Sequence, residues 1–135
     1  MDLSPIVTHL KAELTGVRQV GGAADLEAAA AGTLAAPACF VMPHSEQVTD
    51  EDMDGDGLLR VVFAVVLVVA NRRDITGGAA LADLDALRRA VRTALGSLLL
   101  PDAQVAPRFS SGSLVQFSDG QMMWADEFVV FLVDF

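Results

Sequence analysis

The residues best suited to site chemistry in this sequence are three aspartates and a glycine in the segment DMDGDG. Asp52, Asp54 and Asp56 stand at positions 1, 3 and 5 of a calcium-binding EF-hand loop, and Gly57 stands at position 6. Alternate carboxylates supply oxygen ligands in such a loop, and the glycine permits its sharp turn. The segment therefore suggests a small calcium-binding module that uses residues 50–57.

The second half of the same segment does not match an EF-hand. Position 12 must supply a bidentate glutamate, but it falls on Phe63, or on Val61 if the loop starts at Asp50. The chain then continues as LLRVVFAVVLVV, a β-branched run typical of a strand, whereas an EF-hand requires an exiting helix. We therefore expect an acidic hairpin loop here, with no metal and no cofactor.

The other chemically active side chains form no catalytic or metal-binding pattern. His9 and His44 have no cysteine or carboxylate at ligand spacing. SSGS (Ser110–Ser113) lacks the strand–turn–helix setting of a nucleophile elbow, and VGGAAD (20–25) lacks the lysine of a phosphate loop. Cys39 lies in an apolar run, so we expect a buried and unreactive thiol. The sequence does not predict an enzyme.

Two short segments place charged residues in unusual surroundings. NRRD puts Arg72, Arg73 and Asp74 at the end of the longest apolar run, in an otherwise acidic chain. WADEF places Trp124 and Asp126 on one face of the last expected strand. A carboxylate between two aromatic side chains is unusual in a core, so Asp126 needs an arginine partner or coverage by another subunit. The alternatives are a solvated turn for NRRD and core packing for Trp124.

The composition predicts one folded domain over residues 1–135. Hydrophobic residues make up 53% of the 135 residues and charged residues 20%, so we expect a single core. The net charge of −9 disfavours broad binding to nucleic acid, although an acidic surface allows DNA to slide past without adhering. The first residues do not resemble a signal peptide, and the apolar run 58–70 is too short for a membrane helix. We expect a soluble protein made in the cytoplasm.

Hydrophobic periodicity and turn residues predict three helices and five strands. The expected helices cover 4–15, 23–31 and 79–99, and the expected strands cover 17–20, 38–42, 58–70, 108–117 and 122–135. Ser4 should cap the first helix, Pro43 should end the second strand, and Leu81 should start the buried stripe of the last helix. The order α-β-α-β-β-α-β-β predicts an α+β domain whose mainly antiparallel sheet has its helices packed on one face.

The order of several longer segments is distinctive. They are SPIVTHLKAEL followed by GVRQVGGAADL, then APACFVMPHSE, a long strand leading to ANRRD, ITGGAALADLDALRRAVRTALGSLLLPDA, and a hairpin that ends in QMMWADEFVVF. In this order and at these spacings they resemble the tail terminator proteins of long-tailed bacteriophages and of related prophage or gene-transfer particles. The resemblance covers nearly the whole chain, and the acidic segment DEDMDGDG departs from it.

The resemblance implies a structural protein of the virion. Tail terminators are α+β proteins that assemble, typically as a homohexameric ring, on the last ring of the finished tail tube. They end tube growth and present a surface to the neck or head-completion proteins, and DNA passes through the ring without specific binding. The implied partners are other copies of this chain, the tail tube protein and a neck protein, and the implied location is the tail–neck junction.

The strands expected at 58–70 and 122–135 are longer than most strands of small domains, as they would be if neighbouring subunits covered them. We expect the interface to include eight residues: Arg72, Arg73, Asp74, Asp52, Asp54, Asp56, Trp124 and Asp126. Two alternatives stay open, namely a neck or head-completion protein of the same particle and a calcium-binding module.

Overall fold

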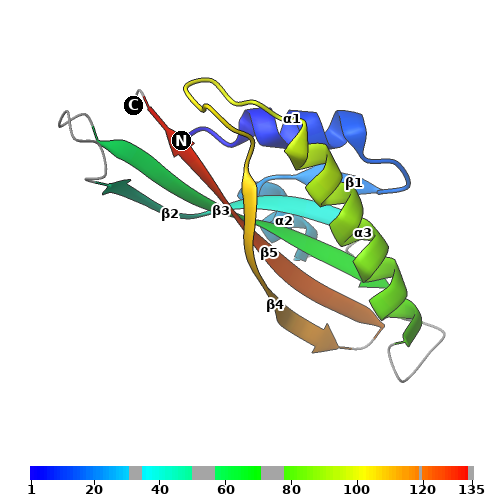
Figure 1. Cartoon of the computed structure of the whole chain (residues 1–135). Helices are drawn as coiled ribbons and strands as arrows, with labels where there is room; N and C mark the ends of the chain where they lie inside the picture. The colour runs from blue at the N-terminus through cyan, green and yellow to red at the C-terminus, as the bar shows by residue number, and fades with distance from the viewer. Residues whose placement is uncertain (31–34, 50–56, 71–77, 119, 134–135) are drawn as a thin grey trace.

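The chain folds into an α+β structure, and the computed structural model describes residues 1–30, 35–49, 57–70, 78–118 and 120–133 (Figure 1). The elements are α1 (Ser4–Glu13), β1 (Gln19–Gly21), α2 (Ala23–Ala30), β2 (Ala38–Thr49), β3 (Leu58–Ala70), α3 (Gly78–Gly96), β4 (Arg108–Ser118) and β5 (Gln121–Leu132). The strands form one mixed sheet in the order β1-β2-β3-β5-β4. β1 and β2 are parallel, and all other neighbours are antiparallel. The expected α+β class and mostly antiparallel sheet are confirmed.

The central strand is β3, the most apolar segment of the chain. Its residues Val61 to Val69 are all buried, because both faces of the strand are covered. Alternate side chains such as Phe63 and Leu67 point into the larger core cluster, and Val66 and Val68 point into a second cluster on the opposite face. The long β-branched run therefore forms the central strand, which pairs along nearly its whole length with β2 on one side and β5 on the other.

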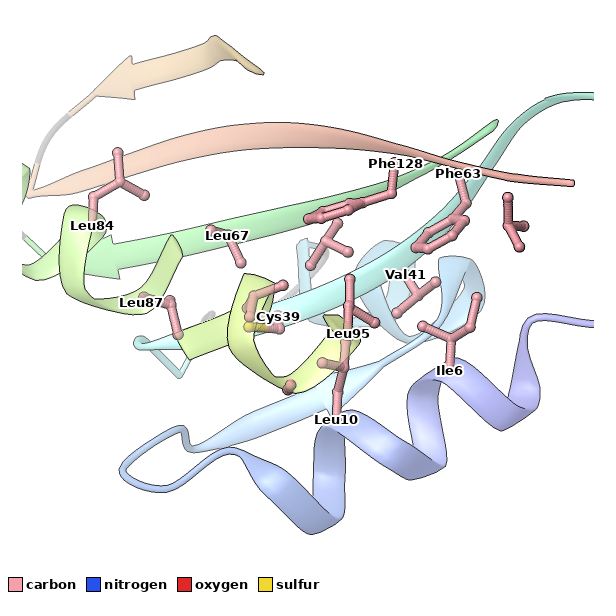
Figure 2. Packing of buried hydrophobic residues seen from close by; sticks show 14 of the residues in the cluster. Ile6, Leu10, Cys39, Val41, Phe63, Leu67, Leu84, Leu87, Leu95 and Phe128 are labelled. Carbon is pink, nitrogen blue, oxygen red and sulfur yellow. The ribbon is translucent and has the colours of Figure 1, made fainter. Parts of the chain in front are cut away.

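Helices cover both faces of the sheet, so the expectation that they pack on one face is wrong. α1 and α3 cover the larger cluster, to which Ile6 and Leu10 of α1 and Leu84 and Leu95 of α3 belong, and Leu10 lies beside Leu95 (Figure 2). α2 packs on the other face, with Leu26 against a smaller cluster that contains Phe40. The cause is the parallel pairing of β1 with β2, because parallel strands need a crossover connection and α2 provides it.

β2 continues to Thr49, well beyond the end that Pro43 predicted. Its register with β3 shifts between Pro43 and Ser45, so the proline lies at a bulge where its missing N–H is tolerated. Side chains from Pro43 to Val48 are exposed, which explains why the polar sequence HSEQVT resembled a loop. The acidic segment therefore follows a longer strand than expected.

Two smaller predictions about helix residues are also wrong. Asp2, not Ser4, accepts the hydrogen bonds at the start of α1, from the Ser4 N–H at 2.9 Å and the Ser4 hydroxyl at 2.7 Å. These two hydrogen bonds, the backbone one first, lower the pKa of the Asp2 carboxyl. In α3, Leu81 is exposed, and Ala80 begins the buried stripe because it precedes Leu84 by one helical turn.

Among the helices that the structure describes, none combines the length and the apolar character needed to cross a membrane.

Candidate functional site

A buried carboxylate on β5 is paired with an arginine from α3. Asp126 is fully buried, and it is the only charged residue buried in the described part of the chain. Arg88 donates to it through Nε, at 3.2 Å from Oδ1 and 2.9 Å from Oδ2, and through Nη2 at 3.0 Å from Oδ1. The Trp124 indole N–H donates to the same Oδ1 at 2.8 Å. The pairing satisfies a charge that would otherwise be costly to bury, and it supplies the arginine partner that was one expectation for Asp126.

Arg88 is the central residue that the sequence interpretation missed. Its guanidinium lies 4.7 Å from the centroid of the Trp124 ring and 5.8 Å from that of the Phe109 ring. It therefore packs against aromatic rings in addition to its hydrogen bonds with the carboxylate. The signal that places it is its position one turn after Leu84, at the margin of the buried stripe.

Gly112 brings β4 directly over this buried cluster. It lies opposite Asp126 in the pairing of β4 with β5. A Cβ atom at Gly112 would lie 2.5 Å from the Asp126 Oδ1 atom and 3.0 Å from both the Arg88 Nη2 and the Trp124 Nε1 atoms. Only a glycine leaves room there, so the position of β4 depends on the Arg88–Asp126–Trp124 cluster.

β4 is exposed and carries four large apolar side chains, Phe109, Leu114, Val115 and Phe117. Every side chain from Arg108 to Phe117 is exposed, including Phe109 at 42%, Leu114 at 53% and Phe117 at 48%. The Arg92 guanidinium covers part of this surface, 4.3 Å from the centroid of the Phe109 ring. Apolar side chains grouped on a well-fixed strand are typical of a protein–protein contact surface.

Of the eight expected interface residues, the structure brings together two, Trp124 and Asp126. Trp124 also packs against the larger core cluster, as the alternative for it predicted. The other six lie outside the described residues: Arg72, Arg73, Asp74, Asp52, Asp54 and Asp56.

The two EF-hand frames end inside the core. Phe63, at position 12 of the frame that starts at Asp52, is fully buried and stacks on Phe128 with ring centroids 5.7 Å apart. Val61, at that place in the other frame, is also buried. Both residues belong to β3, so neither frame offers the bidentate carboxylate or the exiting helix that an EF-hand requires.

The other polar side chains that could take part in catalysis form structural contacts. Ser111 donates to Glu127 Oε2 at 3.0 Å, and His44 Nε2 lies 3.0 Å from Oε1 of the same carboxylate. The carboxylate stands between the hydroxyl and the imidazole, so this histidine cannot take the serine proton as it would in a triad. His9 Nε2 lies 2.7 Å from the Ala94 carbonyl oxygen and joins α1 to α3.

Cys39 is buried as expected, and burial raises the pKa of its thiol to about 12. In the part of the chain that the structure describes, no three histidine, cysteine or acidic side chains are grouped so that they could hold a metal ion.

Comparison with known proteins identifies the family of this chain. The family model described as "Phage tail terminator protein" matches residues 1–132. No curated protein matches the chain. The matched family is one of structural proteins and not of enzymes, and its place in the virion is the tail. The match spans almost every residue, so the chain belongs to the phage tail terminator family and its role is structural, in assembly of the phage tail.

Proposed function

We propose that this protein forms a ring on the finished end of a phage tail tube. The ring ends tube polymerisation and offers its other side to the neck or head-completion proteins, at the tail–neck junction. The observation that carries this proposal is the family match over residues 1–132. The hexameric state typical of tail terminators is the stoichiometry that we expect.

The fold supports such a role through its long strands and its exposed edge. β3 has 13 residues and β5 has 12, which is long for a domain of this size. β4 exposes apolar side chains over a buried cluster that holds it in place. A rigid surface that is already ordered loses little conformational entropy when a neighbouring subunit binds.

DNA would pass through the centre of the ring. The chain carries a net charge of −9, so copies arranged around a channel would repel the phosphate backbone instead of retaining it. Binding to DNA should therefore be nonspecific and weak at physiological salt.

Two further sets of residues remain proposed parts of the interface. One is Arg72, Arg73 and Asp74, and the other is the acidic residues Asp52, Asp54 and Asp56. We expect the charge reversal Arg73→Glu to leave the monomer folded and to disrupt assembly. Circular dichroism and light scattering on the variant measure the two effects separately. Normal assembly of Arg73→Glu would mean that these arginines are not part of the interface.

The direct test of the function is tube growth in the presence of the purified protein. Tail tube protein is allowed to polymerise while light scattering records the growth. The protein should stop growth when it is present in far smaller amounts than the tube protein, because each tube end needs only one ring. Phe63→Asp is the matched control, since it places a carboxylate in the core and unfolds the chain.

Growth that continues in an excess of folded protein would contradict the proposal. Binding to isolated heads or necks, without any effect on tubes, would point instead to a head-completion protein of the same particle.

A further inference from the structure

One edge of the sheet is open in a way that soluble monomers usually avoid. β4 pairs with β5 on one side, and no described strand pairs with its other side. Natural edge strands are protected by charged side chains, proline or coverage by other elements. The stretch FSSGSLVQF on β4 contains neither a charged residue nor a proline, and all its side chains are exposed.

The opposite side of the sheet has a second open edge. β1 pairs with only the first part of β2, from Ala38 to Phe40. Among the described residues, no strand pairs with the outer side of β2 from Val41 to Thr49, and Val48 there is 54% exposed. This edge is similar in length to β4, which runs from Arg108 to Ser118.

These two edges do not pair with each other within the chain, and three strand pairings separate them in the order β2-β3-β5-β4. All three pairings are antiparallel, so β4 runs opposite to β2. If a second copy is related to the first by rotation about an axis parallel to the strands, the β2 strands of the two copies point in the same direction. Its β2 edge would therefore meet β4 of the first copy as an antiparallel pair, the arrangement with the more favourable hydrogen bonds.

The β4 side of the sheet carries arginines, and the β2 side carries carboxylates. Arg92 and Arg108 lie on the β4 side, and neither forms an ion pair with a described residue. Glu46 lies on the β2 edge, where it pairs with the N-terminal ammonium of Met1, and the hollow beside Val41 and Pro43 is lined by Asp2 and Asp25. Antiparallel pairing directs the Arg108 end of β4 toward the Glu46 half of the neighbouring β2. In a chain of net charge −9, such a contact reduces the repulsion between copies.

We propose that copies of this protein join head to tail, with β4 of one copy extending the sheet at the outer edge of β2 (residues 41–49) of the next. The contact is heterologous, so it generates a ring when the rotation between copies closes. Leu114, Val115 and Phe117 are covered by the neighbouring copy. This inference rests on the proposed ring, and it identifies the surfaces that form the ring.

Cross-linking between cysteine variants tests which edges meet. All variants carry Cys39→Ala, so the introduced thiols are the only ones. Ser113→Cys on β4 and Gln47→Cys on β2 are prepared as separate proteins, mixed, and treated with a short bis-maleimide. The mixture should give covalent dimers, and neither protein alone should do so. Lys11→Cys on α1 replaces Gln47→Cys in the control mixture and should give no dimer.

Association measurements test the apolar part of the contact. Leu114→Lys and Phe117→Lys place a charge on exposed positions, so the fold should be retained. Each should weaken self-association roughly tenfold or more, measured by sedimentation. The reason is that the contact between copies would bury the lysine charge in place of an apolar side chain. Leu81→Lys and Leu99→Lys are matched controls at exposed leucines away from β4, and they should associate like the unmodified chain.

The outcomes separate this inference from the proposed function. If the unmodified protein forms rings, and the mixed cysteine variants do not cross-link or the lysine variants on β4 assemble normally, the edge pairing is wrong and the ring stands. Dimers from Ser113→Cys alone would also overturn it, since they indicate a symmetric β4–β4 contact. If the unmodified protein forms no ring in solution or on tubes, the proposed function fails as well.

Discussion

At the scale of single residues, the central feature is the Asp126 carboxylate, which is buried and paired with Arg88. We expect Arg88→Ala to lower the free energy of unfolding by about 3 kcal/mol, because removal of one partner leaves an uncompensated buried charge. Urea denaturation measures the change. Arg89→Ala is the control, since Arg89 forms an exposed pair with Asp85 that is worth at most ~0.5 kcal/mol.

A double replacement sharpens this prediction. Arg88→Met combined with Asp126→Asn should cost less than Arg88→Ala alone, because no charge then stays buried without its partner. Equal losses for Arg88→Ala and Arg89→Ala would show that the ion pair does not hold β5 and α3 together.

Gly112 allows a second prediction at the same scale. Gly112→Ala should lower the free energy of unfolding by about 1–3 kcal/mol, because the new methyl group would lie 2.5 Å from the Asp126 Oδ1 atom. Gly96→Ala is the matched control at the end of α3. A Cβ there meets nothing within 4 Å, so this change should be neutral or stabilising by up to about 1 kcal/mol. Similar effects of the two changes in thermal or urea unfolding would contradict the close approach of β4 to the cluster.

At the scale of helices and strands, the sequence predicted the local elements better than their arrangement. The β3 segment and the stripe of α3 were recognisable because their periodicity reflects burial directly. The packing of α2 on the second face was not, because nothing local in QVG indicates that β1 pairs parallel to β2. The polar half of β2 was missed for a related reason, since an exposed edge strand has no apolar face to reveal its period.

The helices should differ strongly in local stability. α2 has 8 residues and none is buried, whereas α3 has 19 residues and six are buried. Short helices are marginal without packing, so we expect the amide protection of α2 to be at least about a hundredfold lower than that of α3. Hydrogen exchange measured by mass spectrometry gives both values. α1, with 10 residues and two of them buried, should lie between them, and equal protection of α2 and α3 would contradict this account.

At the scale of the candidate site, the sequence predicted part of what the structure describes. Trp124 and Asp126 were singled out because alternation placed a carboxylate among aromatic side chains on one face of a strand. Arg88 was missed because its partner is distant in the sequence, and helical spacing alone cannot distinguish a solvated arginine from a paired one. The surface of β4 was missed because exposure to a neighbour or to solvent leaves the same pattern in the sequence.

For the whole molecule, a chain of the tail terminator family combines a buried core with two sheet edges that no strand of the described residues pairs with. An exposed apolar edge strand is a hazard for a soluble monomer, and in the proposed assembly it would be a contact surface between copies. In the proposed ring, the net charge of −9 would keep DNA from adhering as it passes. The family match gives the chain a structural role in phage tail assembly, and the proposed contacts would carry that role out.

Images of tail tubes mixed with the purified protein test this account most directly. Negative-stain electron microscopy of tubes with and without the protein compares their ends. The account predicts closed rings of the protein in solution and one ring at the end of each treated tube, where bare tubes show none. A protein that stays strictly monomeric and leaves all tube ends bare would contradict it.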